Sequence, residues 1–199
     1  MDAAHKSIAP RKSPAQTRSK RTVEWILEGA ARVFRAEGFA ATTNRIAQAA
    51  GVSVGSLYEY FPNKQALLVA LAERHVVAAE QGVESALTMR ASAREFLSAL
   101  QAAILGSQRY PSHAIDLVAD PCAAADLRTR VQVLRERVLS ALVERARAIG
   151  CSDPELRARA VFGVIAELSS RSLYEASNAK THAALAAHLL ELGIAHLAA

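Results

Sequence analysis

The sequence is poor in aromatic residues and contains no long hydrophobic run. Aromatic residues make up 5% of the 199 residues, and the runs of β-branched residues that favour strands are scarce. Alanine and leucine dominate instead, and both favour helices, so we predict an all-α fold. No apolar stretch reaches the roughly 18 residues that a membrane span needs, and the N-terminal residues lack the continuous apolar segment of a secretory signal. We therefore expect no membrane partner.

Cysteine is also scarce. The two cysteines, Cys122 and Cys151, are too few for a disulfide framework and agree with a reducing, cytoplasmic location. They either pair with each other or remain two spectator thiols, and the second interpretation is the simpler. Cys151 lies in the loop GCSDP, where it could sense oxidation, but the sequence places no basic residue beside it to activate the thiol.

Patterns typical of catalysis or metal binding are missing. The chain has no nucleophile elbow, phosphate-binding loop or dinucleotide fingerprint. Its histidines do not stand at ligand spacing from cysteines or carboxylates, and His182, His188 and His196 do not share one face of the last predicted helix. We therefore predict no enzymatic activity, no metal site and no bound cofactor.

Positive charge is concentrated at the N-terminal end. Residues 1–64 contain ten Lys and Arg against five Asp and Glu, whereas residues 65–199 contain fourteen of each kind. Such an asymmetry is expected where one end of a chain meets a polyanion. A charge run alone usually marks only a solvated face, so this interpretation depends on a motif in the same region.

Residues 42–64, TTNRIAQAAGVSVGSLYEYFPNK, have the pattern of two short helices joined by a tight turn. Thr42 is predicted to cap the first helix, and Gly51 to end it, because glycine accepts a positive φ. Ser53 is predicted to cap the second helix, which Pro62 ends. Helices with so short a link cross steeply, as in a helix-turn-helix DNA-binding module.

The chain before this motif begins with residues 1–20, which contain Pro10, Pro14 and five Lys or Arg. We predict a disordered basic arm there. The arm either adds phosphate or minor-groove contacts or is only a solubilising leader. A helix follows at 22–37, with Trp25 off its buried stripe and partly exposed. Gly29 costs this helix about 1 kcal/mol relative to alanine, which close packing against a neighbouring helix would explain.

The chain after the motif shows neither internal repeats nor strand alternation. Helical patterns continue to the terminus, and we predict further helices at 64–87, 93–109, 112–118, 124–149, 154–176 and 181–198. The helix from Lys64 starts beside the second helix of the motif and ends in the rest of the chain. The prediction is an all-α protein in two parts.

Residues 26–39, ILEGAARVFRAEGF, and the pattern T-T-x-x-I-A-x-x-A-G-V-S-x-G-S-L-Y-x-Y-F-x-x-K-x-x-L-L at 42–68 resemble the N-terminal domain of TetR/AcrR-family transcriptional regulators. Gly29 departs from the alanine usual in the family. The resemblance implies a homodimer whose recognition helices enter successive major grooves of a palindromic operator, and a small ligand that releases the DNA. It divides the chain into the arm, a DNA-binding domain at 20–80 with its helix-turn-helix at 43–62, and a helical effector-binding and dimerisation domain at 81–199.

The residues predicted to contact double-stranded DNA open or line the two short helices: Thr42, Thr43, Asn44, Arg45, Val54, Gly55, Ser56, Tyr58, Tyr60 and Lys64. The last four match family positions that hold phosphates or read bases. A tyrosine ring can pack on the domain while its phenol reaches a phosphate, although Tyr58 could instead be a half-buried core residue. Lys64 stands at a helix start, which favours anions.

Few polar side chains are available to read bases. Asn44 suits adenine and Arg45 suits guanine. Val54 and Gly55 either read a thymine methyl or merely permit close approach, so we expect much of the specificity to come from DNA shape. Of the two threonines before Asn44, Thr42 is predicted to cap the first short helix and Thr43 to contact a phosphate.

The candidate effector pocket is centred on the helix at 154–176. Its predicted lining combines apolar and polar side chains, as ligand pockets do: His113, Phe162, Ile165, Ser169, Arg171 and Tyr174. In the simpler alternative, Arg171 pairs on the helix surface with Glu167 or Glu175. The helices at 154–176 and 181–198 are expected to form the dimer interface, where alanine-rich faces permit close approach.

The main hypothesis is a ligand-responsive repressor. One alternative is an architectural DNA-binding protein of the same fold, with a filled C-terminal core and no effector. Another is a helical enzyme or carrier that retains the module as a relic, against which the missing catalytic residues argue.

Overall fold

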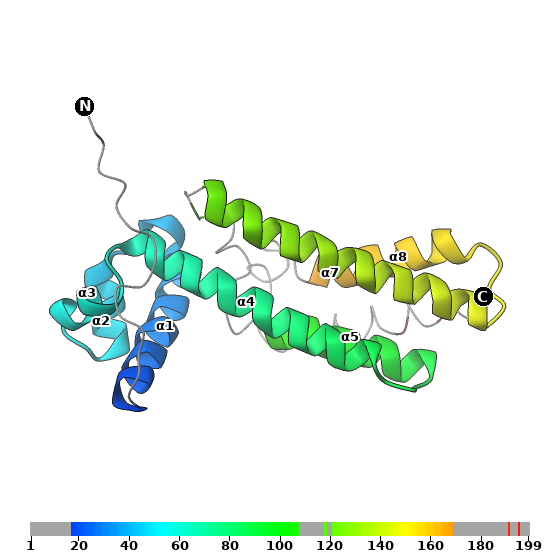
Figure 1. Ribbon diagram of the computed structural model, residues 1–199, viewed down its shortest axis with the longest axis horizontal. Coiled ribbons are helices and arrows are strands. Elements are labelled where there is room, and N and C mark those ends of the chain that lie inside the picture. The colour runs from blue at the N-terminus through cyan, green and yellow to red at the C-terminus, as the bar shows by residue number, and fades with distance from the viewer. Residues whose placement is uncertain (1–16, 108–117, 119–120, 169–190, 192–194, 196–199) are drawn as a thin grey trace. The chain divides into compact units, whose positions relative to one another are not determined.

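The structure, a computed structural model, describes residues 17–107, 118, 121–168, 191 and 195. Every regular element in these residues is helical (Figure 1), which confirms the all-α prediction. The elements are α1 (Thr17–Glu37), a 3₁₀ turn (Gly38–Ala40), α2 (Thr43–Ala50), α3 (Val54–Tyr60), α4 (Lys64–Leu87), α5 (Ala93–Ser107), α7 (Pro121–Ala148) and α8 (Pro154–Leu168). Of the predicted helices at 112–118 and 181–198 only Val118, Glu191 and Ala195 are described, and the end of the helix predicted at 154–176, from residue 169 on, lies outside the described residues.

The chain divides into two compact units. Unit 1 contains Met1–Arg74 together with His113–Arg128, and unit 2 contains His75–Ser112 together with Thr129–Ala199. The helices α4 and α7 therefore each contribute residues to both units. Among the described residues, no helix has the length and apolarity needed to cross a bilayer.

Unit 1 is built on α1. Its stripe of Ile26, Ala30 and Phe34 is fully buried, while Trp25, off the stripe, is 49% exposed as predicted. The helix starts at Thr17 rather than at the predicted Thr22, so residues 17–20, which were assigned to the arm, are helical. The segment TRSKR contains no proline or glycine, and nothing in it stops the helix from extending beyond its buried stripe.

At Gly29 the helices α1 and α2 pack too closely to leave room for a side chain. A Cβ built on Gly29 would lie 2.8 Å from the amide nitrogen of Ala50 and 2.9 Å from its Cα and Cβ. This confirms that close helix packing accounts for the glycine. A hydrogen bond also joins these two helices: the Arg32 guanidinium donates to the carbonyl oxygen of Ala49.

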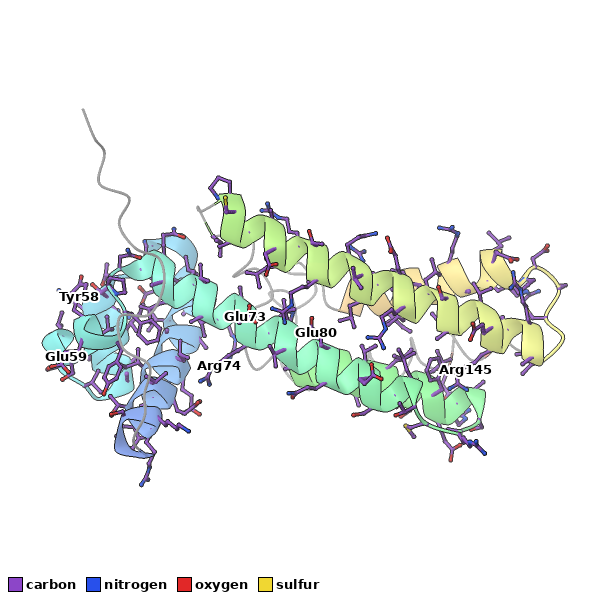
Figure 2. The ribbon with its side chains drawn as sticks, viewed as in Figure 1. Tyr58, Glu59, Glu73, Arg74, Glu80 and Arg145 are labelled. Atoms are coloured by element: carbon purple, nitrogen blue, oxygen red, sulfur yellow. The ribbon has the colours of Figure 1, made fainter. Side chains whose placement is uncertain are left out.

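Unit 2 has its own apolar core, formed where α4, α5, α7 and α8 contribute fully buried side chains such as Phe96, Leu100 and Leu142. Arg145 closes one end of this core. Its guanidinium lies 3.8 Å from the centroid of the Phe96 ring and donates 3.2 Å to the carbonyl oxygen of Met89, in the loop after α4. Figure 2 labels Arg145 on α7.

Two ion pairs join α4 to α7 within unit 2. Arg130 donates to both carboxylate oxygens of Glu80, from Nε at 2.9 Å and from Nη2 at 2.6 Å, and Arg137 pairs with Glu84. The Arg130 guanidinium holds the pKa of Glu80 below its ordinary value of 4.5. These pairs lie one helical turn apart on α4.

The observed start of α7 corrects a predicted boundary. The helix begins at Pro121 and not at Ala124. The helix predicted at 124–149 left Pro121 outside, yet a proline fits the first turn of a helix, where its missing N–H has no intrahelical acceptor. Asp153, the residue before α8, takes a positive φ of 106° instead of the extended conformation usual for a helix cap.

Candidate nucleic-acid interface

The two short helices of unit 1 are held at their ends by the predicted caps. Thr42 Oγ1 accepts a hydrogen bond from the Arg45 amide at 3.3 Å, and Ser53 Oγ accepts one from the Ser56 amide at 3.0 Å. Between them Gly51 ends α2 with a φ of 68°, a conformation that glycine adopts without a Cβ penalty. Each cap satisfies an amide that the helix start would otherwise leave unpaired.

A hydroxyl pair connects α2 with α3. Thr43 Oγ1 and the Tyr58 phenol oxygen lie 2.9 Å apart, and Tyr58 remains 39% exposed. Tyr58 is therefore a surface residue, and the alternative in which it belongs to the core is wrong. Both hydroxyls were predicted phosphate contacts, and the structure brings them together at an exposed position. Figure 2 shows Tyr58 at the α2–α3 end of unit 1.

Asn44 and Arg45, the two predicted base readers, differ in their surroundings. Arg45 donates to Glu37 Oε1 from Nε at 3.0 Å and from Nη2 at 2.6 Å, although its side chain is 59% exposed. Asn44 is exposed, and its side chain forms no hydrogen bond with any residue that the structure describes. In the protein without DNA, Arg45 is thus bound to Glu37 at the end of α1, whereas the side chain of Asn44 is available to contact a base.

The remaining predicted DNA contacts lie on α3 and at the start of α4. Val54 is 36% exposed, Gly55 is exposed, and Ser56 and Lys64 are half-buried. The hydroxyls of Ser56 and Ser53 lie 2.9 Å apart. Tyr60 is only 8% exposed, which fits a ring packed against the domain and leaves its contact with a phosphate a prediction.

Glu59 is a surface residue of α3 that sequence reasoning passed over. It is exposed and lies between Tyr58 and Tyr60, and Figure 2 shows it at the α2–α3 end of unit 1. Helical spacing already contained the signal, because Glu59 follows the buried Leu57 by two residues and so lies on the opposite side of the helix.

The predicted effector pocket is covered only in part by the described residues. Ile165 is 6% exposed within the core of unit 2, and the half-buried Phe162 packs against that core, with the Arg135 guanidinium 5.6 Å from its ring centroid. Ile165 is therefore a core residue. The other predicted lining residues lie outside the part of the chain that the structure describes: His113, Ser169, Arg171 and Tyr174.

A groove of about 540 Å³ lies between α4 and α7 in unit 2. It contains none of the predicted effector residues, and the Glu80–Arg130 and Glu84–Arg137 ion pairs line it.

The described residues contain no cluster of three potential metal ligands. Cys122 and Cys151 do not form a disulfide with each other.

Unit 1 thus contains a helix-turn-helix, formed by the capped helices α2 and α3 and packed against α1. With the exposed hydroxyls of Thr43 and Tyr58, it has the features of a DNA-binding domain. The family model of the bacterial regulatory proteins of the tetR family matches residues 26–71. This match identifies residues 26–71 as a DNA-binding domain of the TetR type. No curated protein sequence matches the chain.

Solved structures share the fold over most of the chain. PfmR, a TetR-family regulator from Thermus thermophilus, is 22% identical, with a TM-score of 0.64 over 83% of this chain and 97% of that one. FadR from Bacillus subtilis, solved with stearoyl-CoA, is 21% identical, with a TM-score of 0.57 over 87% and 98%. AibR, solved with isovaleryl coenzyme A and operator DNA, is 21% identical, with a TM-score of 0.58 over 86% and 97%. At these identities the likeness establishes the fold alone.

Proposed function

We propose that the protein is a cytoplasmic, ligand-responsive repressor that binds a palindromic operator as a homodimer and is released by a small-molecule effector. The observation that carries the proposal is the exposed Thr43–Tyr58 hydroxyl pair at 2.9 Å, in a helix-turn-helix that the TetR-family model matches. One short recognition helix reads few bases, so two copies supply the two half-sites that specific binding needs.

Phosphate contacts supply most of the affinity in this proposal. Thr43, Tyr58, Tyr60 and Lys64 hold the DNA backbone, and such contacts fix register without reading sequence. At four phosphates for each subunit, the logarithm of the binding constant should fall against the logarithm of the salt concentration with a slope of about −7 for the dimer.

The test is a fluorescence-anisotropy titration of operator and random DNA at several salt concentrations. Tyr60→Phe and Lys64→Ala should weaken both complexes alike, and Lys64→Ala should make the slope shallower by about 2 for the dimer. Arg159→Ala is the matched control, because it removes the same charge from an exposed position on α8 in unit 2 and should change neither complex. A slope near zero for the unsubstituted protein would refute DNA binding.

The effector is proposed by analogy with proteins of the same fold. AibR was solved with isovaleryl coenzyme A and FadR with stearoyl-CoA, so acyl-CoA thioesters of increasing chain length form the first screen. Binding should raise the melting temperature and dissociate the operator complex. Free coenzyme A is the control that separates recognition of the acyl chain from recognition of the nucleotide.

The burial of Ile165 in the core of unit 2 favours a second candidate, an architectural DNA-binding protein with a filled C-terminal core and no effector. The two functions differ in a measurable way. The architectural protein would bind operator-sized random fragments almost as tightly as any selected sequence, and a metabolite library would not change its melting temperature.

A further inference from the structure

The recognition helix α3, Val54–Tyr60, carries a single charged side chain, and that side chain is acidic. Glu59 lies about 200° around the helix axis from the fully buried Leu57, on the side of α3 that faces away from the core. Gly55, four residues earlier, shares this side and contributes no side chain. Glu59 therefore projects from the part of α3 that can approach DNA most closely.

The carboxylate of Glu59 has no partner among the described residues of the protein without DNA. Among the described residues it makes no hydrogen bond or ion pair, although unit 1 carries an excess of positive charge. Other acidic residues of the same unit are engaged, since Glu37 holds Arg45 and Glu24 holds Arg74. Glu59 consequently has no visible role in holding the helices of unit 1 together.

An unpaired carboxylate on a helix that meets DNA has a physical cost. It repels the phosphates on both sides of the major groove, and this repulsion weakens binding to every sequence alike. The cost is offset only where the carboxylate accepts a hydrogen bond from a base. In the major groove cytosine presents its N4 amino group as a donor, and carboxylate side chains are the acceptors that suit it.

We propose that Glu59 is a specificity-determining residue that accepts a hydrogen bond from the N4 amino group of one cytosine in each operator half-site. The inference rests on the proposed DNA-binding function and deepens it. Glu59 then acts twice: it favours cytosine through the hydrogen bond, and it disfavours other bases because its charge remains unpaired beside the phosphates. Loss of a good base contact of this kind changes discrimination by about 5- to 150-fold.

The experiment selects bound fragments from a random double-stranded library with the full-length protein and with two variants, Glu59→Gln and Glu59→Ala. The unsubstituted protein should enrich a two-fold symmetric sequence with cytosine at one defined position of each half-site. Glu59→Ala should lose the preference at that position only, and Glu59→Gln should shift it towards adenine, which an amide side chain suits. Both variants should bind random DNA at least as tightly as the unsubstituted protein.

Glu144→Gln is the matched control. Glu144 is exposed on α7 in unit 2 and makes no hydrogen bond or ion pair to a described residue, so this change removes the same charge from a comparable helical surface. It should leave base preference and random-DNA affinity unchanged. Circular dichroism of all variants checks that the helices are intact.

The outcomes separate the inference from the function on which it rests. If the unsubstituted protein enriches no sequence, sequence-specific regulation itself is refuted. If it enriches a sequence and both Glu59 variants enrich the same one, Glu59 is only a repulsive surface charge and the inference is wrong. An unchanged preference for cytosine in Glu59→Ala would overturn the inference in the same way.

Discussion

Replacing Gly29 by alanine should destabilise unit 1, because the added Cβ has no room beside α2. It would lie 2.8–2.9 Å from three atoms of Ala50, two of which belong to the backbone. A flexible side chain could move aside, but a backbone atom moves only with its helix. Restoring ordinary van der Waals distance requires α1 and α2 to separate locally by about 0.5 Å, and such overpacking costs about 1–3 kcal/mol.

Two opposing terms decide the size of the effect. Alanine returns up to about 1 kcal/mol of helix propensity relative to glycine, so the net destabilisation should be about 1 kcal/mol. The assay is urea unfolding followed by the fluorescence of Trp25, which is the sole tryptophan and lies on α1. With a denaturant slope of about 2 kcal/mol per molar, the midpoint should fall by about 0.5 M.

Gly163 provides the matched control. It lies in α8, where an added Cβ would meet nothing within 4 Å, so Gly163→Ala keeps the propensity gain without the steric cost and should not lower the midpoint. In a double-mutant cycle, Ala50→Gly should cost less in the Gly29→Ala background than in the unsubstituted protein, because it removes one of the three close atoms. A Gly29→Ala protein as stable as the unsubstituted one would refute the packing argument.

Two further predictions concern a helix cap and an ion pair. Ser53→Ala should destabilise unit 1 by about 1 kcal/mol, measured by the same fluorescence, because the amide that Ser53 Oγ caps at 3.0 Å loses its acceptor; an unchanged midpoint would contradict this. Arg130 lowers the pKa of Glu80 from 4.5, so the pair stabilises unit 2 above that pH, and this stabilisation disappears as the pH falls through the lower folded value. Glu80→Gln should accordingly be less stable at pH 7 and lose less stability on acidification, as followed by circular dichroism; parallel acid profiles would contradict the assignment.

Features that depend on neighbouring residues were predictable from the sequence. Thr42, Gly51 and Ser53 act as predicted, and Asn63 caps α4 by accepting from the Ala66 amide at 2.9 Å. Each of these roles follows from a side chain and an amide a few residues away. The family resemblance at 26–39 and 42–68 rests on the same local chemistry, and the family match to residues 26–71 confirms it.

Features that depend on the approach of distant segments were not predictable. The Arg45–Glu37 pair joins residues 8 apart, the Thr43–Tyr58 bond 15 apart and the Arg130–Glu80 pair 50 apart. No periodicity in one helix specifies which side chain of another helix will meet it. For this reason the sequence could not distinguish Asn44 from Arg45 as the residue that reads a base. The structure shows that Arg45 forms an ion pair with Glu37.

The composition of unit 1 restricts how its DNA-binding domain can be transferred to another protein. The predicted domain at 20–80 is a continuous segment, but the compact unit also includes His113–Arg128, in which Val118, Ala124 and Leu127 are at most 6% exposed. A chimera cut within α4 would leave this second segment with the donor chain. Its apolar partners would then be open to water or covered by foreign side chains. Exchange of operator specificity between regulators should therefore succeed best when both segments are transplanted together.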